Sequence, residues 1–262
     1  MTFFIPEINS VKTVQEENKI IRDLRLKRLI PSFFTLGNLL CGFLAVLNVV
    51  EGTKENLVHA AWWIIIAAIF DLLDGKIARL TRTASDFGIE LDSLADVVSF
   101  GVAPAVLFYK YAFSDAGSIG YFVSFLFLAA GSLRLARFNV TASKGKKLYF
   151  KGMPIPAGAS ILAAFILFSE NVWGGFLNFD FCVVLIIMSS LAMVSSFKYG
   201  LFPKLSFFNK LETIKSLWII SLLIVSAIFP DESFFPLGVY YLFSGPIKFF
   251  SAPAFNFVFH KE

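Results

Sequence analysis

The composition of this chain is that of a membrane protein and excludes an ordinary soluble domain. It has 262 residues, of which 57% are hydrophobic and 16% charged, and it contains 33 phenylalanines; soluble domains average about 45–50% apolar and about 25% charged residues. The net charge of +4 does not indicate nucleic-acid binding, because the basic residues cluster at the ends of apolar segments, as in positive-inside topology and contact with anionic lipids. Cys41 and Cys182 lie in apolar runs without disulfide or zinc-site spacing.

The N-terminal segment is charged and partly amphipathic. Residues 11–29 interleave apolar side chains with lysines and arginines, a pattern typical of a helix on the cytoplasmic membrane interface; a charged face that is simply solvated is the alternative. The first thirty residues carry too many charges for a secretory signal peptide. We therefore expect an N-terminal interfacial helix within residues 1–30.

The rest of the chain predicts an all-α, polytopic transmembrane helix bundle of about eight spans, of which the first six form the core. Apolar runs of membrane-spanning or nearly spanning length cover about residues 31–50, 57–80, 88–111, 119–139, 154–170, 180–196, 216–229 and 234–250. The seventh is short for a full span. We expect domain limits of 1–30 for the interfacial helix, 31–200 for the main membrane domain and 201–262 for the additional C-terminal helices and tail.

The distribution of basic residues predicts the topology. With the N-terminus inside the cell, the outer loops hold only Lys54 and Lys110 as cations, and every other lysine and arginine falls on the cytoplasmic side. An even number of spans then places both termini in the cytoplasm. We expect a multi-pass protein of the cytoplasmic membrane.

Two stripes of carboxylates and small residues stand out at the junction of the second and third spans. At helical spacing the first consists of Asp71, Asp74, Gly75 and Ala78, and the second of Gly88, Asp92 and Asp96. The turn between them is short, so the two helices must be antiparallel neighbours whose stripes can face each other. The topology places this pocket at the cytoplasmic surface.

Four converging carboxylates repel one another and call for a cation. Oxygen ligands without histidine or cysteine suit Mg²⁺, Mn²⁺ or Ca²⁺ rather than zinc. Two such ions would neutralise four carboxylates, and a two-metal site suits displacement at phosphorus. On the first span, Thr35 and Asn38 share a stripe with Gly42, and we expect the two polar residues to face a polar cavity.

The residues alone leave three kinds of site open. A structural salt-bridge network is disfavoured because the acids outnumber the nearby cations. An ion transporter, such as one for divalent metals, is disfavoured because the acids lie at the cytoplasmic end rather than at the membrane midplane, where transport sites usually lie. Metal-dependent phosphoryl transfer on a lipid-linked substrate is the interpretation that the spacing favours.

The pattern Asp71-x2-Asp74-Gly75-x2-Ala78-Arg79-x8-Gly88-x3-Asp92-x3-Asp96 resembles the signature of the CDP-alcohol phosphotransferases at every fixed position. Within that family the sequence around residues 91–104, 133–139 and 151–157 is similar to the prokaryotic, membrane-embedded CDP-diacylglycerol–serine O-phosphatidyltransferases. The resemblance implies CDP-diacylglycerol and L-serine as substrates, membrane lipids as surroundings and a homodimer as the assembly. Other acceptors for the same chemistry, namely glycerol 3-phosphate, an inositol phosphate or choline, stay open.

The resemblance also implies roles for individual residues. Asp71, Asp74 and Asp92 would hold the divalent metal ions, with Asp96 completing the shell and acting as general base. The residues expected to bind CDP-diacylglycerol or to make room for it are Gly75, Ala78, Arg79, Ser85 and Gly88, with Thr35 and Asn38 bordering the same pocket. Arg134 and Arg137 are candidates for binding the acceptor or a phosphate, since guanidinium groups pair well with carboxylates and phosphates; plain interfacial arginines are the alternative.

Overall fold

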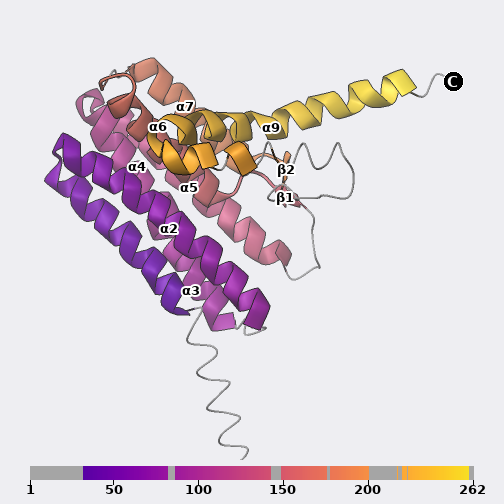
Figure 1. The fold of residues 1–262 in the computed structure, drawn as a ribbon, viewed down its shortest axis with the longest axis horizontal. Helices are drawn as coiled ribbons and strands as arrows, with labels where there is room; N and C mark the ends of the chain where they lie inside the picture. The colour runs from indigo at the N-terminus through magenta and orange to yellow at the C-terminus, as the bar shows by residue number, and fades with distance from the viewer. Residues whose placement is uncertain are drawn as a thin grey trace, which may run out of the picture.

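The computed structural model describes residues 32–81, 86–142, 149–175, 178–200, 217, 220–222 and 224–259. This part of the chain forms a bundle of helices with one small β-ribbon (Figure 1). Four helices are long and apolar enough to cross a membrane: Ser32–Glu51, Lys54–Ile77, Phe87–Ala116 and Ser118–Thr141. The expected interfacial helix within residues 1–30 lies outside the described residues.

The first two spans form a helical hairpin close to the limits predicted from the sequence. The first helix covers Ser32–Glu51 and α2 covers Lys54–Thr81. Gly52 adopts a φ of 73° between them, a left-handed conformation that favours glycine. The turn after α2, including Ser85, is largely outside the described residues.

The third span is one continuous helix in which α-helical and π-helical segments alternate. The sequence does not predict these changes. The span begins as α3 (Asp86–Asp96), continues through the π-helical η1 (Val97–Val102), α4 (Ala103–Phe108) and the π-helical η2 (Tyr109–Phe113), and ends in the 3-10 turn η3 (Ser114–Ala116). Pro104 in the first turn of α4 has no N–H for a regular helical bond. The first π-helical segment follows directly on Asp96, and such segments are frequent at functional sites.

The remaining helices complete the bundle. These are α5 (Ser118–Ala142), α6 (Ile155–Asn171), α7 (Phe179–Val194) and α9 (Pro230–Phe259). In the bundle, α6 contacts α2, α7 and α9. The apolar helices α6 and α7 are shorter than the first four spans, and α9, with 30 residues, is much longer than the predicted span 234–250. Of the predicted seventh span, the helical residues 217, 220–222 and 224–228 are described.

A two-stranded antiparallel ribbon, which the sequence does not predict, is added to the α-helical bundle. Strand β1 (Tyr149–Lys151) pairs with β2 (Lys198–Gly200), so that Phe150 faces Tyr199 in the register. Strands of three residues are too short to show the alternating pattern by which strands are predicted. The ribbon joins the segment before α6 to the segment after α7.

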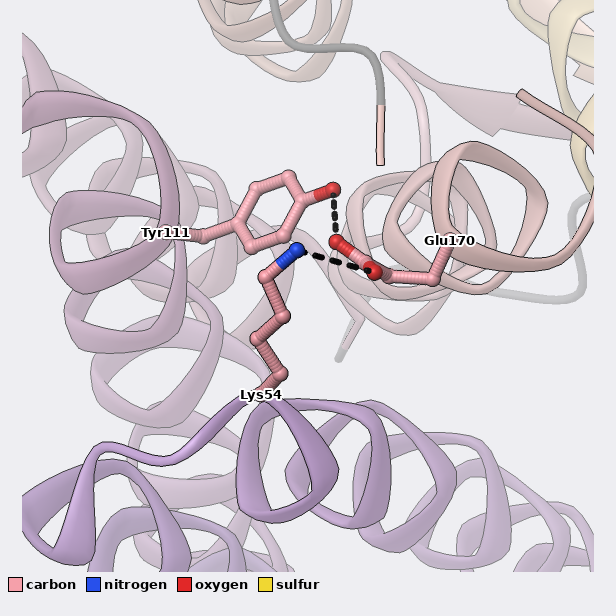
Figure 2. Close-up of polar contacts among 3 residues, drawn as sticks. All are labelled: Lys54, Tyr111 and Glu170. Carbon is pink, nitrogen blue, oxygen red and sulfur yellow. Dashed lines mark hydrogen bonds and ion pairs between the residues drawn. The ribbon is translucent and has the colours of Figure 1, made fainter. Parts of the chain in front are cut away.

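A polar cluster holds three helices together at the end of the bundle remote from the aspartates (Figure 2). Glu170 of α6 accepts a hydrogen bond of 2.8 Å from the Tyr111 hydroxyl of η2 and lies 4.0 Å from the Lys54 ammonium of α2. Because the Lys54 side chain is 78% exposed, the ion pair contributes little, and the hydrogen bond is the stronger link. Lys54 and Asp71 lie about 26 Å apart along α2 at 1.5 Å per residue.

Close packing between the first helix and η1 generates a stability prediction. A Cβ atom on Gly42 would overlap Ser99 Oγ and lie 2.6 Å from Ser99 Cα, so a larger residue must displace backbone. We expect Gly42→Leu to destabilise the protein by at least about 1–3 kcal/mol, or roughly 2–10 °C in melting temperature for a chain of this size. Thermal unfolding in detergent measures it.

Val50→Leu is the matched control, because Val50 lies on the same helix and is 74% exposed. We expect this variant to melt like the parent protein. Equal melting temperatures for Gly42→Leu and the parent would contradict the packing described here.

Candidate functional site

The aspartates of α2 and α3 converge, as their helical stripes predict. Asp71 and Asp74 lie one turn apart on α2, and Asp92 faces them from α3. One carboxylate oxygen from each of these three residues lies within 4.8 Å of the other two. Asp96, one turn further along α3, is buried and interacts electrostatically with the other three carboxylates without belonging to that close group.

The close carboxylate group fits a hard divalent cation. Asp74 Oδ2 and Asp92 Oδ1 are buried and have no hydrogen-bond partner among the described residues. A buried, unpaired carboxylate oxygen is costly, and a metal ion is the partner that three neighbouring carboxylates favour. Since all the ligand atoms are carboxylate oxygens, Mg²⁺, Mn²⁺ or Ca²⁺ matches the donor set better than zinc.

The first helix supplies the polar residues that contact these carboxylates. The Thr35 side chain is within hydrogen-bonding reach of the Asp74 carboxyl, and Asn38 Nδ2 donates a hydrogen bond of 3.3 Å to Asp96 Oδ1. The backbone oxygen of Asn38 accepts a 2.9 Å bond from Ser99 Oγ. Thr35 and Asn38 therefore face the polar site, as predicted, and the close approach at Gly42 holds their helix against the third span.

The small residues of the two stripes lie beside the carboxylates in sequence. The Gly75 backbone is within hydrogen-bonding reach of the Asp74 carboxyl, and Gly75 and Gly88 are half-buried. Ala78 and Arg79 belong to α2, but their side chains, like Ser85, are outside the described part of the structure. The expected contacts of these residues with CDP-diacylglycerol stay predictions.

The two arginines of α5 have different surroundings. Arg134 is 6% exposed, has its guanidinium 5.4 Å from the centre of the Phe138 ring, and interacts electrostatically with Asp96 and Asp71. Arg134 is thus a buried cation within electrostatic range of two of the carboxylates; its predicted role in binding the acceptor or a phosphate stays a prediction.

Arg137 points to the carboxyl end of α7 instead. Its guanidinium donates hydrogen bonds of 3.2, 2.8 and 3.2 Å to carbonyl oxygens of Met193, Val194 and Ser195. These carbonyls at a helix end need partners, and an arginine there is also favoured by the helix dipole. The contacts give Arg137 a structural task; its predicted role in acceptor binding stays a prediction.

Sequence reasoning missed two polar groups close to the site. Asn139 Nδ2 of α5 donates a 2.8 Å hydrogen bond to Ser93 Oγ, which itself donates to the Ile89 carbonyl at 2.9 Å. Ser93 could have been noticed as the neighbour of Asp92.

A carboxylate cluster for hard metal ions, set in a bundle of apolar helices, defines a membrane enzyme of the phosphoryl-transfer class. The chain belongs to the CDP-alcohol phosphatidyltransferase family, whose model matches residues 28–197. A protein of Helicobacter pylori named CDP-diacylglycerol–serine O-phosphatidyltransferase is 36% identical over 229 residues, which are 84% of this chain and 90% of that protein. Proteins with the same name are 41% identical in Methanocaldococcus jannaschii (62% of this chain, 73% of that protein) and 35% identical in Bacillus subtilis (67% and 92%).

The geometry predicts which carboxylates bind metal. Asp74→Asn and Asp92→Asn each remove one negative charge and one ligand oxygen from the close group. Since even residues that only support metal ligands typically contribute 10- to 100-fold in affinity, we expect each variant to weaken Mn²⁺ binding by at least about 10-fold. Electron paramagnetic resonance of free Mn²⁺, titrated with detergent-purified protein, measures it without reference to activity.

Glu90→Gln provides the control, because Glu90 lies on α3 but is exposed and is not among the three close carboxylates. It should bind Mn²⁺ as the parent protein does. Unchanged Mn²⁺ affinity in both aspartate variants would refute the assignment of the metal site.

Proposed function

We propose that the chain transfers the phosphatidyl group of CDP-diacylglycerol to the hydroxyl of L-serine, giving phosphatidylserine and CMP in phospholipid biosynthesis. The observation that carries the proposal is the convergence of Asp71, Asp74 and Asp92 within 4.8 Å, beside a fourth carboxylate on the same helix as Asp92. The names of the relatives support serine as the acceptor.

Asp71, Asp74 and Asp92 would hold the divalent metal, with Asp96 at the edge of the shell; we propose two ions, Mg²⁺ or Mn²⁺. Bound there, the metal would stabilise negative charge that develops on the diphosphate as CMP leaves. Thr35 of the first helix is within hydrogen-bonding reach of Asp74 and would fix the position of this carboxylate.

Asp96 is the proposed general base. A serine hydroxyl is a poor nucleophile at neutral pH, and a positioned carboxylate that takes its proton contributes typically 10²–10⁴-fold. Asn38 donates to Asp96 Oδ1, which fixes the orientation of the carboxylate. The serine oxygen then forms a bond to the phosphorus that carries diacylglycerol, the bond from this phosphorus to the CMP oxygen breaks, and the proton resides on Asp96 until it passes to water.

The remaining predicted residues would bind the two substrates. Gly75, Arg79 and Ser85 would contact the CDP-diacylglycerol head group, with Ala78 and Gly88 making room for the nucleotide. Arg134 is suited to the serine carboxylate or to a lipid phosphate, because guanidinium groups form bidentate pairs with both. Its burial beside Asp96 supports the acceptor carboxylate as the closer partner.

We also propose the arrangement in the membrane. The chain would cross the cytoplasmic membrane about eight times, with the residues 1–30 on the inner interface, the catalytic domain over 31–200, and both termini and the active site facing the cytoplasm. The lipid tails would stay between helices in the bilayer while serine and CMP exchange with the cytosol. The proposed assembly is a homodimer.

Release of CMP from CDP-diacylglycerol tests the reaction. With Mn²⁺ or Mg²⁺ in detergent, we expect the parent protein to release CMP only when L-serine is added, and Asp96→Asn to lower kcat by about 10²–10⁴-fold, the usual contribution of a general base. Glu90→Gln should keep the parent rate.

Three outcomes would contradict the proposal. Release that depends on glycerol 3-phosphate, an inositol phosphate or choline rather than serine would assign another acceptor. Full activity in Asp96→Asn would remove the base from the mechanism. Uptake of divalent ions by reconstituted vesicles, with no CMP release in the presence of any of these alcohols, would indicate a transporter.

A further inference from the structure

Helix α3 carries two of the four carboxylates of the site but is only lightly packed. It lies at one end of the bundle, beside the part of α2 that holds the other two (Figure 1). Among the α3 residues whose burial is described, only Ala95 and Asp96 are buried. Phe87 is 73% and Leu94 66% exposed. Packing therefore buries only the end of α3 that continues into η1, and the position of Asp92 must depend on other contacts.

Two hydrogen bonds join α3 to helices that are distant in the chain. Asn38 Nδ2 of the first helix donates to Asp96 Oδ1 at 3.3 Å. Asn139 Nδ2 of α5 donates to Ser93 Oγ at 2.8 Å, which is close to the best distance for such a bond. The two donors belong to different spans, so α3 is tied to the bundle at two separate points.

The Ser93 hydroxyl is itself oriented by a local bond. It donates to the Ile89 carbonyl at 2.9 Å, the bond that a helical serine commonly makes to the carbonyl four residues earlier. The hydroxyl hydrogen is thus used within α3, while the oxygen still has a lone pair for a donor from outside. Asn139 supplies this donor. The three groups form one continuous chain of hydrogen bonds, and the members of such chains strengthen one another.

This chain of bonds ends beside a carboxylate of the close group. Ser93 directly follows Asp92, and at 3.6 residues per turn it lies about 100° from Asp92 and about 60° from Asp96 around the helix axis. An oxygen of Asp92 lies within 4.8 Å of oxygens of both α2 carboxylates. A rotation of α3 that carried Asp92 away from them would also stretch the bond between Ser93 and Asn139.

We propose that Asn139 is a positioning residue for the metal site, which acts through Ser93 to hold α3 with Asp92 facing the carboxylates of α2. The inference rests on the metal site of the proposed function, and it does not depend on which alcohol accepts the phosphatidyl group. It extends that function by giving α5 a task in metal binding.

Mn²⁺ binding by detergent-purified protein, followed by electron paramagnetic resonance of the free ion, tests the proposal. Asn139→Ala and Ser93→Ala break the bond from its two ends. Partners bonded directly to metal ligands typically contribute 10- to 100-fold in affinity, and Asn139 acts one step further away, so we expect each variant to weaken Mn²⁺ binding roughly 5- to 50-fold. Ser93→Thr keeps the hydroxyl and should bind Mn²⁺ within about threefold of the parent affinity.

Val140→Ala is the matched control, because Val140 is the next residue of α5 and is 76% exposed. It should bind Mn²⁺ as the parent protein does. Melting temperatures in detergent with EDTA separate positioning from loss of the fold. Loss of one half-buried hydrogen bond should lower the melting temperature of Asn139→Ala or Ser93→Ala by no more than about 5 °C.

A double-mutant cycle adds a measurement that a merely structural role would not move. If Asn139 acts through Ser93, the variant that carries both alanines should bind Mn²⁺ within about twofold of the weaker single variant. If the two residues contributed independently, their fold-changes in Mn²⁺ affinity would multiply.

The results that would overturn the inference differ from those that would overturn the proposed function. If the parent protein binds Mn²⁺, then unchanged affinity in Asn139→Ala, as great a loss in Ser93→Thr as in Ser93→Ala, or fold-changes that multiply in the cycle would refute the role of Asn139 alone. If the parent protein binds no Mn²⁺, the metal site and the inference fall together. Mn²⁺ binding that follows the expected pattern, without serine-dependent CMP release, would support the role of Asn139 and contradict the proposed acceptor.

Discussion

The repulsion among carboxylates at the junction of α2 and α3 is the constraint on which the rest of the structure depends. One oxygen from each of three of these carboxylates lies within 4.8 Å of the other two, and the helices around them are otherwise apolar. Neighbouring like charges in a poorly polarisable medium destabilise a fold strongly, so carboxylates this close either take up protons or have cations near them. A bound divalent ion would be the main compensation and the buried Arg134 a second one.

The polar contacts around this group come from helices that are distant in sequence. Thr35 and Asn38 reach the aspartates because Gly42 lets the first helix approach η1 closely. Arg134 arrives from α5. The site is thus a meeting point of four spans, and its geometry depends on packing of small residues as much as on the charged ones.

Much of the fold and of the site could be predicted from the sequence, because both follow from local periodicity. Spans at 31–50 and 57–80 were expected where helices occur, since a long apolar run has few alternatives in a membrane. The facing of Asp71 and Asp74 toward Asp92 follows from helical spacing and a short turn. The same spacing placed Thr35 and Asn38 on the polar side of their helix.

The features that could not be predicted from the sequence depend on contacts between residues that are distant in the chain. The π-helical segments of the third span, the ribbon between Tyr149–Lys151 and Lys198–Gly200, and the bonds of Arg137 to the end of α7 have no periodic signature. These features come from tertiary packing, which overrides local preference.

The ribbon of β1 and β2 extends the intact domain beyond the region that the family model matches. The family match ends at residue 197, and β2 begins at Lys198, so the end of the match divides the two paired strands. A chain cut there would lose the partner of β1, the buried Tyr199 and the helix docked on it. The segment that the family model matches is therefore smaller than the packed unit, which includes β2 and the part of α9 that packs on Tyr199.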